Sequence, residues 1–138
     1  MPLSIPNLLR QLDEPEIIDW ALELKNGREA YVFLINALKQ DTLNVNQTVN
    51  ALHALFRIRG HGSREEVLQA LVESAQNANK QIRSEAVQLA TGLVKLSHLA
   101  DKEPLNLSEQ QVKTLREATT RGLTTKAHAL AADFFEMF

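Results

Sequence analysis

Cysteine is absent from the 138-residue sequence, which excludes disulfide bonds and cysteine-rich metal sites and fits a reducing compartment. Aromatic residues are scarce as well, at 5% of the chain, although hydrophobic residues make up 44% of it. We therefore expect a largely aliphatic core, which suits packed helices. The 15 basic and 17 acidic residues nearly balance, so no general field attracts the chain to nucleic acid or to an anionic membrane.

Long apolar runs and strand-like alternation are also missing. No segment has the apolar length that a membrane-spanning helix needs, and residues 1–12 lack the basic and apolar regions of a secretory signal. We therefore expect a cytoplasmic protein that does not enter a membrane. Because no segment alternates polar and apolar residues for long enough to form a strand, we expect no sheet.

The sequence does contain a helical pattern that repeats. In residues 79–96, apolar side chains recur at steps of three and four, as on one face of a helix. Residues 46–60 align with this stretch after a shift of 35 positions, and residues 16–24 align after a further shift of 34. The segments between them, 27–38 and 63–74, match each other with an offset of 36. Two helices in a period of this length are typical of an α-solenoid.

Residues 82–93, IRSEAVQLATGL, resemble the second helix of a HEAT-like (armadillo-type) repeat. The resemblance lies in Ile82 followed by Arg83, in the small apolar pair after them, and in the ending with Gly92. Residues 79–96 form the well-matched repeat, and the two earlier copies are degenerate. The resemblance implies a curved stack of helices that recognises a macromolecule and has no catalytic residues.

These patterns predict a single all-α domain over residues 1–138, built as a right-handed α-solenoid of about four antiparallel helix pairs with seven or eight helices. The repeats are expected at approximately 1–26, 28–60, 63–97 and 108–138, with a connector at 97–107. Capping boxes are expected at Ser63 and Ser108, and helix ends at Gly27 and Gly60. The residues predicted to be buried are Ile18, Ala21, Leu52, Leu55, Phe56, Leu71, Ala86, Leu89, Ala90 and Leu93.

Polar residues occupy matching positions in the three second helices, which predicts one binding face. The predicted partner-binding residues on it are Asp19, Glu23, Asn50, His53, Arg57, Glu85, Gln88 and Lys95. The leading interpretation is a non-catalytic module that binds a protein partner there. One alternative is an inhibitor of the bacterial immunity protein or antitoxin type. Another is a nucleic-acid binder related to the HEAT-like DNA glycosylases, which the balanced charge disfavours.

Candidate chemistry is sparse. The histidines show no metal-ligand spacing, so we predict no metal. Gly60-His61-Gly62 lacks the lysine and the preceding strand of a nucleotide-binding loop, and we predict no cofactor and no enzymatic activity. Arg57, Arg59 and Arg64 flank a glycine turn that precedes a helix N-terminus, and they form a candidate anion-binding cluster. The interpretation that we favour is that Arg57 and Arg59 complement the C-terminal dipole of their own helix.

The C-terminal segment, residues 123–138, is rich in phenylalanine. Phe134, Phe135 and Phe138 lie within its last five residues. They either fold onto the preceding helices as a cap or form a docking surface, because the end of a solenoid has no next repeat to cover it. A monomer and a homodimer through this helix are both compatible with the sequence.

Overall fold

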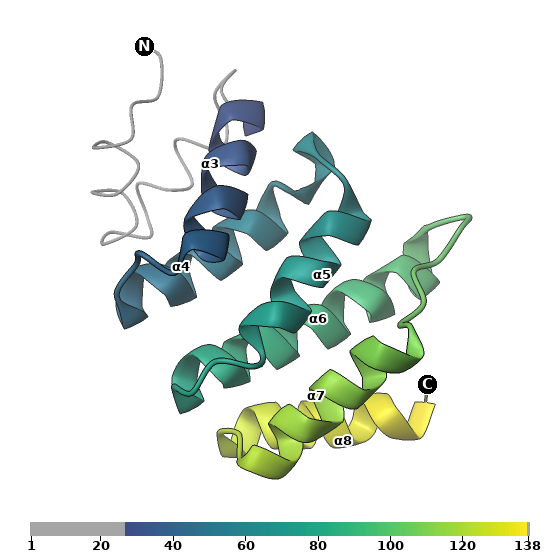
Figure 1. The fold of residues 1–138 in the computed structure, drawn as a ribbon. Helices are drawn as coiled ribbons and strands as arrows, with labels where there is room; N and C mark the ends of the chain where they lie inside the picture. Colours follow the sequence, from purple (N-terminus) through teal and green to yellow (C-terminus); the bar gives the residue numbers. More distant parts are fainter. Residues whose placement is uncertain (1–26, 138) are drawn as a thin grey trace. The chain divides into compact units, whose positions relative to one another are not determined.

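The computed structural model describes residues 27–137, whose regular secondary structure consists of helices joined by loops, with no strand in this range (Figure 1). This confirms that the fold class is all-α. The helices are α3 (Gly27–Gln40), α4 (Val45–Arg57), the 3-10 helix η1 (Arg59–His61), α5 (Arg64–Ser74), α6 (Lys80–Ala100), α7 (Glu109–Arg121) and α8 (Thr125–Met137). The chain forms two compact units, and the boundary between them falls within α5, after Ala70. The first predicted repeat, with Ile18 and Ala21, lies outside the described residues.

In the first unit, α3 packs against α4, and η1 contacts both helices. Leu52 and Leu55 are buried, as predicted. Phe56 is only partly buried, so that prediction was wrong. Phe56 lies at the edge of the apolar face of α4, where the Arg59 guanidinium covers its ring at 4.6 Å from the centroid. The Phe56 ring is therefore covered in part by the Arg59 side chain and not by the apolar core.

In the second unit, α6 packs against α7 and α8. Its buried face runs through Ala86, Ala90 and Leu93, as predicted, and Leu71 is buried too. Leu89 is only partly buried, so its predicted place in the core was wrong. Successive helical residues are about 100° apart, and Leu89 therefore lies well to one side of the buried line through Ala90.

Capping explains several helix starts. Asn79 caps α6, and its side chain accepts hydrogen bonds from the amides of Gln81 and Ile82. Ser108 and Gln111 form the predicted capping box at the start of α7. Gly122, with a φ of 114°, ends α7 in a backbone conformation that favours glycine.

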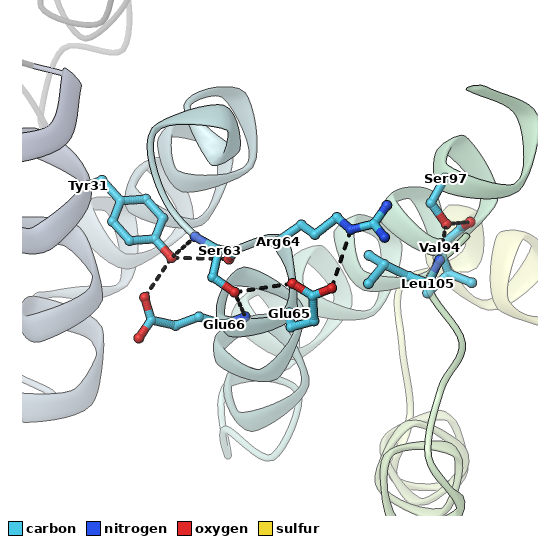
Figure 2. A network of polar contacts seen from close by, with 8 residues as sticks. All are labelled: Tyr31, Ser63, Arg64, Glu65, Glu66, Val94, Ser97 and Leu105. Carbon is cyan, nitrogen blue, oxygen red and sulfur yellow. Dashed lines mark hydrogen bonds and ion pairs between the residues drawn. The ribbon is translucent and has the colours of Figure 1, made fainter. Parts of the chain in front are cut away.

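Two predicted boundaries differ from the observed ones, and the helix end predicted at Gly27 belongs to a segment outside the described residues. Gly27 is the first residue of α3, and it packs so closely on His61 that an added Cβ would lie 2.5 Å from the ring. Gly60 lies in η1, since α4 already ends at Arg57. α6 continues past the predicted connector start to Ala100. Within this helix the Ser97 hydroxyl donates to the Val94 carbonyl at 2.7 Å, and it accepts a hydrogen bond from the Leu105 amide at 2.8 Å (Figure 2).

Candidate functional site

The predicted binding residues of the first unit share one face of α4. Asn50, His53 and Arg57 are separated by three and four residues, which places them on the same side of the helix. His53 and Arg57 are exposed and Asn50 is partly exposed. The opposite side of α4 carries Leu52 and Leu55 in the core. Asp19 and Glu23, predicted for the same face, lie outside the described residues.

The predicted binding residues of the second unit lie on the outward face of α6. Glu85, Gln88 and Lys95 are all partly exposed. Since α4 and α6 belong to different units, each face is a surface of its own unit, and the single binding face across the second helices stays a prediction.

Two leucines that were not among the predicted binding residues also lie on the outward face of α6. Leu96 is 42% exposed and Leu99 is 82% exposed. They fall on the same side of the helix as Leu89, at steps of seven and three. Leu96 is the last residue of the helix predicted over 79–96, and Leu99 lies beyond the predicted end. Extending the three-and-four spacing past Leu96 would have found the stripe.

The arginines of the candidate anion-binding cluster are engaged within the chain. The Arg59 guanidinium donates to the Phe56 carbonyl at 2.9 Å, at the C-terminal end of α4. Arg64 pairs with Glu65 at 3.4 Å. The Arg59 contact agrees with our favoured interpretation, in which a cation complements the dipole of its own helix. Anion binding by Arg57, Arg59 and Arg64 stays a prediction to which these contacts lend no support.

Acidic side chains of the chain itself occupy the N-terminus of α5. Glu65 and Glu66 lie in the first turn, and the Ser63 hydroxyl accepts a hydrogen bond from the Glu66 amide at 3.2 Å. A hydrogen bond from its own backbone amide, together with contacts to Ser63 and Arg64, lowers the pKa of the Glu65 carboxyl. The helix end that would attract an external anion is therefore already supplied with negative charge.

Tyr31 takes part in the cap of α5 from a position 32 residues earlier in the chain. Its hydroxyl lies 2.6 Å from a carboxylate oxygen of Glu66, to which it donates, and it accepts a hydrogen bond from the Ser63 amide at 3.2 Å (Figure 2). In an ordinary capping box the Glu66 side chain would accept from the Ser63 amide directly. The tyrosine hydroxyl thus stands between the two halves of the predicted box.

Raising the pH above 10 should destabilise the folded chain through Tyr31. Burial, together with the hydrogen bond to Glu66, raises the pKa of Tyr31 from 10.0 to about 12. Below pH 10 the phenol is protonated in both states, so its contribution is constant. Between pH 10 and pH 12 only the unfolded chain loses the proton, and the free energy of unfolding should fall by about 2 to 3 kcal/mol. Urea denaturation across this range measures the fall.

The control for this pH dependence is Tyr31→Phe. Tyr31 is the only tyrosine in the chain, so this variant removes the phenol and leaves every other titrating group in place. The slope of stability against pH should be shallower in the variant than in the wild type. Equal slopes would show that the phenol of Tyr31 titrates alike in the folded and unfolded chains.

The C-terminal aromatic residues differ in their surroundings. Phe134 is buried in the second unit and contacts Phe135 edge to face, with ring centroids 5.4 Å apart. Phe135 is partly exposed, and the Arg116 guanidinium lies 4.4 Å from its ring centroid. Phe138 lies outside the described residues. Phe134 thus belongs to the core, as the cap interpretation expects, whereas Leu130 and Met137 leave apolar surface exposed on α8.

Comparisons with known proteins add no further assignment. The chain matches no family model, no curated protein and no solved structure. Within residues 27–137, no three histidine, aspartate or glutamate side chains gather where they could hold a metal ion. None of the helices in this range combines the length and the apolar character that crossing a membrane requires.

Proposed function

We propose that this chain is a cytoplasmic, HEAT-like helical-repeat module, a right-handed solenoid of about four helix pairs that binds a protein partner without catalysing a reaction. The second helices of the repeats carry the binding face. The observation that carries the proposal is the outward face of α6, where exposed leucines lie among polar side chains. α6 is also the helix that bears the HEAT-like pattern.

The composition of this face suits a protein interface. Single exposed apolar residues are common on monomers, but Leu96 and Leu99 lie about one helical turn apart, and Leu89 lies on the same side of the helix about two turns earlier. Glu85, Gln88 and Lys95 provide a polar margin beside them. Protein interfaces typically have an apolar centre that supplies most of the affinity and a polar rim that orients the partner.

The polar face of α4 has a complementary part in the proposal. His53 and Arg57 are exposed on the first unit, whereas both leucines of α4, Leu52 and Leu55, are buried. The exposed charge of Arg57 mainly accelerates association and selects the partner by its charge. We therefore expect α6 to supply most of the affinity and α4 to supply specificity.

Site-specific crosslinking tests this function, and the absence of cysteine makes it direct. Gln88→Cys on α6 and His53→Cys on α4 each carry a photoactivatable crosslinker attached by a maleimide. Asn36→Cys on α3 and Glu117→Cys on α7 are the matched controls, because both positions are exposed on other helix faces. The labelled proteins are irradiated in extract of the native host, and the crosslinked proteins are identified by mass spectrometry.

The expected result is one protein that crosslinks from positions 88 and 53 and not from positions 36 and 117. Capture from the control positions alone would contradict the proposed binding face. Binding of DNA or RNA that weakens with added salt would instead favour the nucleic-acid alternative.

A further inference from the structure

Gly92 is an unexplained glycine in the middle of α6. It is partly exposed, and a Cβ added to it would meet nothing within 4 Å apart from the helix itself. Glycine weakens a helix interior, because it restricts the unfolded chain less than any other residue. No contact among residues 27–137 requires that weakness here. A mid-helix glycine on an open face permits another backbone or a large side chain to approach closely from outside.

The missing side chain at Gly92 leaves a notch on the outward face of α6, and leucines lie on both sides of it along the helix. Leu89, Gly92, Leu96 and Leu99 follow one another at steps of three, four and three, so they form one stripe along the outward face. The exposure increases along the stripe, from Leu89, which is partly exposed, to Leu96 at 42% and Leu99 at 82%. The stripe therefore consists of one gap and three apolar side chains that water reaches.

The steps of three, four and three between the stripe residues are the same whether α6 is followed from its N-terminus or from its C-terminus. In an antiparallel pair of α6 helices, a two-fold axis at position 94 exchanges position 92 with 96 and position 89 with 99. Each Leu96 then faces the Gly92 notch of the other helix, and each Leu89 faces Leu99. A symmetric dimer requires such a self-complementary surface, in which a protrusion and a gap exchange places.

We propose that α6 pairs antiparallel with α6 of a second copy of this chain, with Leu96 of each copy seated over Gly92 of the other. The inference rests on the proposed function, in which this face is a binding surface, and it names one occupant. A single helix pair covers less area than a standard stable interface, so we expect a weak dimer with a Kd on the order of 10 to 100 µM.

Lys95 gives this dimer a recognisable salt dependence. Residue 95 lies one position from the symmetry axis, so the two Lys95 side chains occupy the same flank of the crossing. Their like charges repel each other at low ionic strength, and salt screens that repulsion. Self-association should therefore strengthen as salt is added, and Lys95→Gln should remove most of this dependence.

Sedimentation of the full chain over a range of concentrations tests the dimer. Gly92 is partly exposed and an added Cβ meets nothing within 4 Å, so we expect Gly92→Leu to fold, to fill the notch and to weaken self-association by about 30-fold or more. The double variant Gly92→Leu with Leu96→Gly moves the notch and the protrusion to each other's positions. It restores the complementarity of the stripe and should recover much of the lost affinity. Leu99→Lys should weaken the dimer, because it places a charge against Leu89 of the second copy.

Met137→Lys on α8 is the control, since Met137 is 66% exposed on a different helix. It should leave self-association unchanged, and a loss in this variant alone would assign the dimer to the C-terminal helix instead. A chain that stays monomeric at millimolar concentration, or a Gly92→Leu variant that associates as tightly as the wild type, would overturn the inference. If the chain is monomeric while Gln88→Cys still captures another protein, the proposed function stands and only the dimer fails.

Discussion

Replacing Arg83 with methionine should lower the free energy of unfolding by about 3 kcal/mol. Arg83 is 6% exposed, and its guanidinium donates to three backbone carbonyls. Nε donates to Gly122 at 2.9 Å, and Nη1 donates to Asn77 at 3.1 Å and to Ala78 at 3.0 Å. The side chain thus joins the loop before α6 to the turn before α8. Methionine fills much of the volume but leaves all three acceptors without this donor.

Arg121→Met provides the matched comparison for Arg83. Arg121 also donates from Nη1 to a backbone carbonyl, that of Gln76 at 2.9 Å, but it is exposed. Water replaces an exposed donor, so this variant should lose no more than about 0.5 kcal/mol. Urea denaturation followed by circular dichroism measures both losses. Similar losses in the two variants would mean that burial does not increase the contribution of the Arg83 hydrogen bonds to the free energy of unfolding.

Changing Gly62 to alanine should destabilise the chain by about 2 to 3 kcal/mol. The added methyl group would overlap the ring of Tyr31, which is 1% exposed. The ring has little freedom to move away, because its hydroxyl is hydrogen-bonded to Ser63 and Glu66. The backbone of Gly62 is extended, with a φ of −153°, so alanine adopts it without strain. The expected loss therefore arises from the overlap alone.

Two variants separate this overlap from other effects. Gly60→Ala, two residues earlier, places its methyl group where nothing lies within 4 Å, and it should change stability by less than about 0.5 kcal/mol. In a Tyr31→Ala background the ring is gone, so Gly62→Ala should cost much less than it does in the wild type. An equal cost in both backgrounds would assign the effect to the backbone instead of the ring.

Local information sufficed for much of the helical architecture. The starts of α6 and α7 follow from Asn79 and Ser108, because an N-cap needs only a side chain two or three residues from the amides that it accepts from. The buried line through Ala86 and Ala90 follows from helical periodicity. The polar faces of α4 and α6 are the other side of the same periodicity, so these candidate binding positions could be predicted too.

Only the tertiary structure decided which side chains meet across the sequence. Arg83 belongs to the HEAT-like pattern, but its acceptor at Gly122 lies 39 residues away, and no spacing rule connects them. The contact of Tyr31 with the cap of α5 likewise joins residues 32 positions apart, which no spacing rule connects. The edges of the core, at Phe56 and Leu89, also depended on neighbours from other elements. A helix face follows from the chain's own geometry, whereas the neighbour that covers it is set by packing between elements.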